Sequence, residues 1–245
     1  MLRIHFSVDD AIRIFHFLYK YEKSIKSIFE CRVLALAREL HLKYGVKCSF
    51  YCLFENKNVK ISDVSDRFAE EFQANAEWLK FGFHSKTGAT NYASDDMLYS
   101  DFAQTTEELK RIFKGNENIT DMLRLHFFAG GNKTDVGKMA GCGVKALLTA
   151  DDERKSYYLD GEHIGKEYYD YSNGMKFIPT LVRVENSEDI VAIIKEKIAS
   201  VTDNQILTIF THEWILNNDE IKERLFAAFE YLSNISDKEY INTCL

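Results

Sequence analysis

The sequence contains a single proline, Pro179, among 245 residues, where an average usage of about 5% would give roughly twelve. A proline-rich linker or tail is therefore excluded, and the turns must be built from glycine, asparagine and aspartate. Basic residues are also in deficit, with 31 lysines and arginines against 38 aspartates and glutamates and a formal net charge of −7. Because nucleic-acid binding depends on basic side chains that neutralise phosphates, this balance argues against a nucleic-acid partner.

Closely spaced cysteines and long apolar runs are missing as well. The five cysteines are scattered and form no CxxC pair, which favours buried or free thiols in a reducing compartment. No apolar run approaches the roughly twenty residues of a membrane span, and no charged and apolar leader precedes the patterned segment 2–8. The sequence therefore predicts a cytoplasmic protein with no membrane partner.

Short apolar segments alternate with longer amphipathic ones along the whole chain. Strands are predicted at 2–8, 46–54, 78–83, 122–128, 144–149, 175–184 and 205–210. Helical spacing of apolar residues occurs at 11–20, 27–43, 63–76, 101–114, 133–141, 187–200 and 218–233. Strands separated by helices pair in parallel, because parallel strands need long crossovers. We therefore expect residues 1–245 to form one α/β domain, a distorted (β/α) barrel of about seven parallel strands, with a doubly wound open sheet as the alternative.

Polar residues follow five of the predicted strands at or near their carboxyl ends. They are Asp9 and Asp10; His84; Arg124 and His126; Asp151 and Asp152; and His212, Glu213 and Trp214. The carboxyl ends of parallel strands share one face of such a barrel, where active sites lie. Each residue alone has an ordinary structural explanation, such as a helix cap or a buried histidine. Their coincidence at five strand ends predicts one shared active site.

Five short motifs also resemble those of a known family in their order and strand placement. Residues 6–10, Phe-Ser-Val-Asp-Asp, resemble the Thr-Phe-Asp-Asp motif of the polysaccharide deacetylases, the NodB-type carbohydrate esterases. Residues 83–85 resemble the start of their second motif, in which a further histidine follows the first. Residues 123–126 fall where the family carries an Arg-Pro-rich motif, and 148–152 where its acidic motif lies. Residues 209–212 resemble the final Leu-x-Ile-His, so the resemblance implies the family's distorted barrel of about seven strands.

The resemblance implies metal-assisted removal of an acetyl group from an N- or O-acetylated sugar or a related amide. Asp10 and His84 would be ligands of a divalent ion, which we expect to be zinc. Asp9 would be the general base that takes a proton from water, and Arg124 would orient it and keep it ionised. His212 would protonate the leaving amine or alkoxide.

The second motif departs from the family pattern, because Gly88 stands four residues after His84, where the second histidine is expected. A catalytic zinc site normally has three protein ligands. We therefore predict that His126, at the end of the neighbouring strand, is the third ligand, with Asp95 or Asp96 as weaker alternatives. The family's third motif places a proline beside its arginine. This sequence has no proline beside Arg124, and His126 stands in that same segment.

The substrate is expected to be a small molecule or an oligosaccharide. Three residues are predicted to contact it: Asp151, Asp152 and Trp214. Two other functions stay open. One is a non-catalytic carbohydrate-binding or regulatory relative with a degenerate metal site. The other, less favoured, is a glycoside hydrolase in which Asp9 or Asp10 pairs with Glu213.

Overall fold

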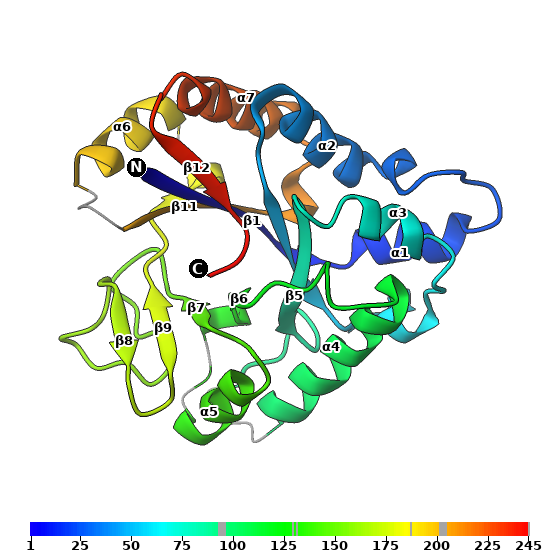
Figure 1. The fold of residues 1–245 in the computed structure, drawn as a ribbon, viewed down its shortest axis with the longest axis horizontal. Helices are drawn as coiled ribbons and strands as arrows, with labels where there is room; N and C mark the ends of the chain where they lie inside the picture. Colours follow the sequence, from blue (N-terminus) through cyan, green and yellow to red (C-terminus); the bar gives the residue numbers. More distant parts are fainter. Residues whose placement is uncertain (93–96, 129, 131, 187, 201–204, 245) are drawn as a thin grey trace.

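The computed structural model describes residues 1–92, 97–128, 130, 132–186, 188–200 and 205–244. Its largest sheet consists of parallel strands in the order β10-β11-β1-β2-β5, with β12 paired to the start of β1 (Figure 1). The strands are β1 (Leu2–Ala11), β2 (Cys48–Leu53), β5 (Leu79–Ser85), β10 (Val182–Arg183), β11 (Ile206–His212) and β12 (Lys238–Ile241). All strand pairs in this sheet are parallel, and the helices between the strands provide the long crossovers that parallel pairing needs.

A second sheet, in the order β6-β7-β9-β8, completes the barrel. Its strands are β6 (Met122–Leu123), β7 (Ala146–Leu148), β8 (Tyr168–Asp170) and β9 (Met175–Ile178), and only β8 is antiparallel to its neighbour. A parallel bridge between Phe81 and Ile119 joins β5 to the segment before β6. On the other side, the Thr208 hydroxyl of β11 donates to the carbonyl of Pro179, just after β9. The parallel strands thus surround one interior, and the prediction of an α/β fold with a parallel barrel is confirmed.

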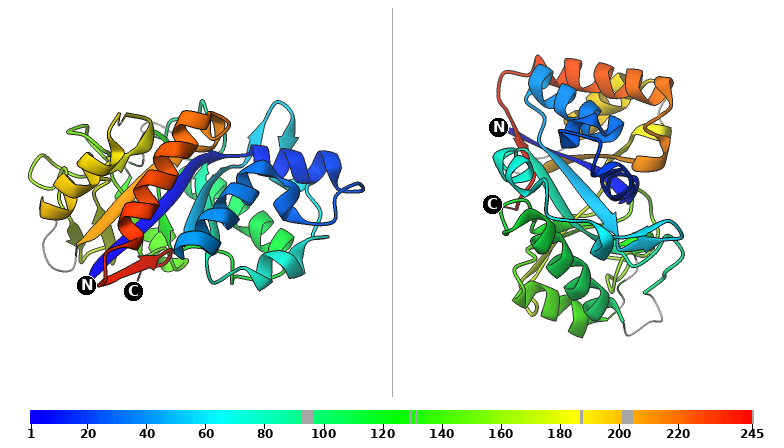
Figure 2. Two further views of the ribbon diagram at one scale, coloured as in Figure 1. Left: turned by 90° about the horizontal axis from the view of Figure 1, so that it is seen from above. Right: turned by 90° about the vertical axis from the view of Figure 1, so that its right-hand side faces the viewer.

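Helices cover the outside of the sheets, and α2 packs beside α7 (Figure 2). They are α1 (Arg13–Tyr21), α2 (Arg32–Tyr44), α3 (Ala69–Ala74), α4 (Leu98–Phe113), α5 (Lys133–Gly141), α6 (Ile190–Ser200) and α7 (Asp219–Ser233). Short elements complete the chain: the hairpin β3 (Glu55–Asn56) and β4 (Val59–Lys60), and the 3₁₀ turns η1 (Ile28–Glu30), η2 (Ile61–Asp63), η3 (His126–Phe128), η4 (Val184–Asn186) and η5 (Glu213–Ile215). Within the described ranges, none of the helices has the length and apolarity to cross a bilayer.

Strand β1 shows how the sequence places polar groups inside the barrel. Its apolar residues alternate with polar ones, and successive side chains of a strand point to opposite faces. Phe6 packs edge-to-face on Phe229 of α7, with ring centroids 5.0 Å apart. On the opposite face, the Ser7 hydroxyl lies 2.9 Å from a guanidinium nitrogen of Arg124. The residues from Ile4 to Asp9 are all buried, so the polar side chains of β1 must find hydrogen-bond partners inside the barrel.

Some of the differences between the predicted and the observed elements have tertiary reasons. The strand predicted at 122–128 ends at Leu123, because the next backbone groups pair with side chains instead of with a strand. The carbonyl of Arg124 lies 2.5 Å from Nδ1 of His84, and the N–H of Leu125 donates to the Tyr157 hydroxyl at 3.3 Å. Strand β12 was not predicted; it covers the start of β1 where β2 has not yet begun.

Candidate metal centre

Strand β1 brings two consecutive carboxylates to one end of the barrel. In a regular strand, Asp9 and Asp10 would point to opposite faces. The register of β1 against β2 shifts between Val8 and Ala11, and Asp10 has a φ of 57°. Such a bulge bends the strand and turns a side chain toward a new direction. Asp9 and Asp10 therefore both lie at this end of the barrel, and the left-handed residue costs about 1–2 kcal/mol in backbone strain.

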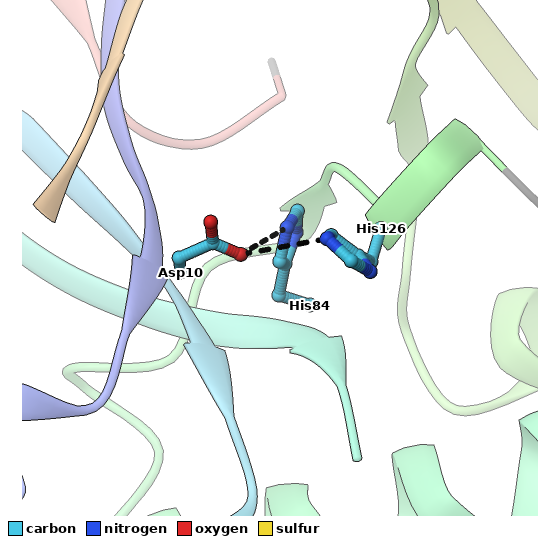
Figure 3. Close-up of side chains that lie close together, drawn as sticks. All are labelled: Asp10, His84 and His126. Atoms are coloured by element: carbon cyan, nitrogen blue, oxygen red, sulfur yellow. Dashed lines mark ion pairs between the residues drawn. The ribbon is translucent and has the colours of Figure 1, made fainter. Parts of the chain in front are cut away.

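Asp10, His84 and His126 converge at this end, as Figure 3 shows. Oδ1 of Asp10 lies 3.4 Å from Nε2 of His84 and 3.7 Å from Nε2 of His126. One ligand atom from each of the three residues lies within 4.8 Å of the other two. A tetrahedral zinc ion with bonds of about 2.1 Å places its ligand atoms about 3.4 Å apart. The spacing of the aspartate to each histidine therefore fits such an ion.

The hydrogen bonding of His84 also fits a cation at this point. Its Nδ1 lies 2.5 Å from the carbonyl of Arg124, which can only accept, so Nδ1 carries the proton. In the neutral ring, the lone pair then lies on Nε2, toward Oδ1 of Asp10. That oxygen is buried and has no hydrogen-bond partner. Two facing lone pairs need a proton or a metal ion between them, so the residues present are suited to a divalent ion.

The surroundings of Asp10 and His126 favour the protonation states that a metal needs. Burial raises the pKa of Asp10, but the adjacent His84 ring and the other histidine charges outweigh it and lower the pKa to about 2. Burial, and then the charge of His84, lower the pKa of His126. Burial lowers the pKa of His84, while the carboxylates of Asp10 and Asp9 raise it to above its ordinary value. At neutral pH, the carboxylate ligand is ionised and His126 is neutral, as metal ligands must be. The raised pKa of His84 means that a metal ion here competes with a proton for Nε2 of that ring.

Arg124 is fully buried and holds Asp9 in place. Its Nη1 lies 3.0 and 3.2 Å from the two carboxylate oxygens of Asp9 and 2.9 Å from the Ser7 hydroxyl. Its Nη2 donates to Thr180 at 2.9 Å, and the guanidinium lies 4.2 Å from the ring centroid of Phe210. A guanidinium keeps its charge when it is buried, so Asp9 supplies the counter-charge it requires. The predicted base therefore lies beside the triad, fixed by the predicted arginine.

His212 lies at the end of β11, where it pairs in register with Asp9 of β1. Its Nδ1 is 2.5 Å from Oε1 of Glu185, and the same oxygen accepts the backbone N–H of His212 at 3.1 Å. Burial raises the pKa of Glu185, but the hydrogen bond and charge of His212 lower it below its ordinary value. With Nδ1–H directed at a carboxylate, the ring has its Nε2 for proton transfer, as in other histidine–carboxylate pairs.

Sequence analysis did not identify Glu185. The residue follows directly on the predicted extended segment 175–184. The other site residues were selected because they follow predicted strands, and the same criterion applied to the strand 175–184 selects Glu185.

The two acidic residues after β7 form ion pairs outside the triad. Asp151 pairs with Arg154 at 3.0 Å and lies 3.8 Å from Arg183. Arg183 is in turn 3.9 Å from Glu185, which links this cluster to His212 through charges. Asp152 pairs with Arg154 at 2.7 Å and is half exposed. A contact of Asp151 or Asp152 with substrate stays a prediction.

Two exposed aromatic rings lie next to the candidate site. Trp214 is 49% exposed, and its ring centroid lies 5.6 Å from that of His212. Phe127 is 54% exposed and lies 3.9 Å from the His126 ring, centroid to centroid. Sequence analysis selected Trp214 and missed Phe127, which lies in a turn where a strand was expected. Phe127 and Phe128 have φ values of 57° and 52°, unusual for such large side chains.

The remaining candidates are placed as follows. Gly88 lies in the turn after β5, and a Cβ there would meet only Leu53 within 4 Å. Asp95 and Asp96, the weaker candidates for the third ligand, lie outside the described residues. Glu213 is buried, and its carboxylate accepts backbone N–H groups at the start of α1.

No family model matches the sequence, and no curated protein matches it. Solved structures match nearly the whole chain. A protein assigned as a polysaccharide deacetylase from Mycobacterium smegmatis has a TM-score of 0.62 at 10% identity, covering 97% of this chain and 85% of that one. Puue allantoinase gives 0.61 at 11%, covering 98% and 87%. A CE4 esterase from Streptococcus mutans gives 0.55 at 11%, covering 99% and 86%. This chain therefore has the fold of the polysaccharide deacetylases and CE4 esterases, as its motifs predicted.

Proposed function

We propose that this chain is a metal-dependent hydrolase of the polysaccharide deacetylase family, which removes an acetyl group from an N- or O-acetylated sugar or a related amide. The observation that carries the proposal is the convergence of Asp10, His84 and His126 beside the ion pair of Asp9 and Arg124. The fold shared with deacetylases and esterases supports the same reaction class. The third ligand would come from His126, which compensates for the glycine in the second motif.

Each residue of the site has its own part in the proposed reaction. Asp10, His84 and His126 would hold the ion, which we propose to be zinc; when bound, it supplies a Lewis acid that acidifies water and polarises the acetyl carbonyl. Asp9 accepts the proton of the attacking water, because Arg124 holds it in position as an anion.

His212, on the strand next to Asp9, donates a proton from Nε2 to the leaving amine or alkoxide. Its Nδ1 faces Glu185, whose negative charge stabilises the imidazolium that the proton transfer needs. Glu185 thus fixes both the orientation and the tautomer of the proposed acid.

The surroundings support a sugar as substrate. The exposed rings of Trp214 and Phe127 offer flat apolar faces of the kind that stack on a pyranose. Asp151 and Asp152 offer acceptors for hydroxyl groups on the side of His212. We propose a cytoplasmic acetylated oligosaccharide, sugar conjugate or small amide as the substrate class.

A glycoside hydrolase has less support. It would need Glu213 as the second carboxylate, but three backbone N–H groups of residues 12–14 occupy the oxygens of that side chain. A non-catalytic relative remains the alternative that the experiment must exclude.

The test measures bound metal after dialysis and acetate release from N- and O-acetylated sugars. The variants are His84→Ala and His126→Ala, with His163→Ala as control, since His163 is a surface histidine paired with Asp160 at 2.6 Å. We expect one equivalent of metal and acetate release in the wild type and the control, and loss of both in the two site variants. Absence of metal in every preparation, with no acetate release after addition of zinc or cobalt, would refute the proposal. Bound metal without hydrolysis of any acetylated substrate would favour the non-catalytic relative.

A further inference from the structure

Helix α1 begins at Arg13, three residues after Asp10, and its own sequence supplies no cap. Ile12 stands at the N-cap position before Arg13, and its side chain makes no capping hydrogen bond. The first turn contains no acidic residue either. The first backbone N–H groups of a helix have no partners within the helix and need acceptors from elsewhere.

Glu213, the first residue of the turn η5 after β11, supplies those acceptors. Oε2 accepts the backbone N–H of Ile12 at 2.8 Å and that of Arg13 at 2.7 Å, and Oε1 accepts the N–H of Ile14 at 2.9 Å. The carboxylate is almost completely buried. It is therefore a cap for α1 that comes from a residue 199 to 201 positions away in sequence.

Two consecutive residues, His212 and Glu213, hold the turn that contains Asp10, one before it and one after it. Before the turn, Asp9 pairs in register with His212. After it, the N–H of Ile12 binds Glu213, the residue that follows His212. Asp10 lies between these two fixed points with a φ of 57°, a conformation that persists only where the surroundings impose it.

We infer that Glu213 is a positioning residue for the candidate metal site, which holds the turn that directs Asp10 toward His84 and His126. This inference rests on the proposed function. The same contacts couple the metal side of the site to the strand that carries His212. A carboxylate that only stabilised α1 would affect folding and leave the metal affinity of the folded protein unchanged.

The chain offers a matched control for the loss of a helix cap. Asn218 stands at the N-cap of α7, and its side chain accepts the backbone N–H of Glu220 at 2.9 Å. It lies five positions after Glu213, at the far end of the same connection, and it caps a helix that carries none of the three proposed ligands. Asn218→Ala thus removes a cap without touching the turn at Asp10.

The experiment titrates the metal-free 245-residue chain with zinc in a calorimeter and follows thermal unfolding by circular dichroism. We expect Asn218→Ala to lower the melting temperature and bind zinc like the wild type. We expect Glu213→Gln to weaken zinc binding by about 10- to 100-fold at a temperature where the variant is folded. Wild-type zinc affinity in folded Glu213→Gln would overturn the inference and leave the carboxylate as a cap only.

A second variant keeps the test decisive if Glu213→Gln does not fold. Glu213→Asp keeps the carboxyl group but shortens the side chain by one methylene, so we expect weaker zinc binding than in the wild type. Unchanged affinity would overturn the inference. A wild-type protein that binds no zinc would overturn the proposed function itself, and the inference with it. The two failures are thus distinguishable.

Discussion

Replacing Asp9 by asparagine removes the counter-charge of a fully buried guanidinium. Arg124 is 1% exposed, and its Nη1 lies 3.0 and 3.2 Å from the two carboxylate oxygens of Asp9. Its other side-chain hydrogen bonds go to Ser7 and Thr180, which are neutral. Breaking a buried ion pair by removing one partner typically costs about 3–5 kcal/mol, because the remaining charge stays desolvated. We therefore expect Asp9→Asn to lower the free energy of unfolding by this amount.

Urea unfolding of the metal-free protein measures this cost. Asp219→Asn is the control, since Asp219 pairs with Lys222 at the surface and an exposed pair contributes about 0–1 kcal/mol. We also expect Arg124→Met in the Asp9→Asn background to recover part of the lost stability, because the orphaned charge is then gone. An Asp9→Asn variant no less stable than the Asp219→Asn control would refute the reasoning, since Arg124 would then not depend on Asp9.

Three further predictions concern the other parts of the site. Glu185→Gln should lower kcat by about 10- to 100-fold with little change in KM, because His212 loses the charge that stabilises its protonated form; steady-state kinetics would contradict this if kcat were unchanged. The pKa of Glu185 lies below its ordinary 4.5, so its ionised form stabilises the fold above that pH and this contribution is lost as the pH falls below 4.5. The difference in unfolding free energy between wild type and Glu185→Gln should therefore shrink on acidification, and a constant difference would refute this. Trp214→Ala and Phe127→Ala should each raise KM for an acetylated oligosaccharide about tenfold without changing zinc affinity, whereas Tyr171→Ala, at a ring that is 90% exposed, should leave KM unchanged.

The strand-end rule accounts for most of what the sequence could predict. Parallel strands place their carboxyl ends together whatever their exact length, so residues as distant as Asp10, His84 and His126 could be grouped before their contacts were known. The order of helices and strands is enough for that argument. The argument does not need the exact residue at which each strand ends.

The unpredicted features depend on contacts between distant residues. Neither Asp10 nor Phe127 is a glycine, so the local sequence does not predict a left-handed conformation at either residue. The bulge in β1 and the turn after β6 depend on tertiary hydrogen bonds, such as that between His84 and the carbonyl of Arg124. Glu213 is another example. Its place beside His212 suggested chemistry, whereas its oxygens cap a helix at the other end of the sequence. Side-chain caps of this kind leave no signature within the helix they serve.

The central claim is that His126 replaces the missing histidine of the second motif as the third metal ligand. Zinc titration calorimetry of wild type, His126→Ala and the double variant His126→Ala with Gly88→His tests it most directly. An added Cβ at Gly88 meets only Leu53, at 3.8 Å, so the backbone there tolerates a side chain. We predict one zinc ion per wild-type chain, a loss of affinity of about a hundredfold or more in His126→Ala, and partial recovery in the double variant. Wild-type affinity in His126→Ala would contradict the claim.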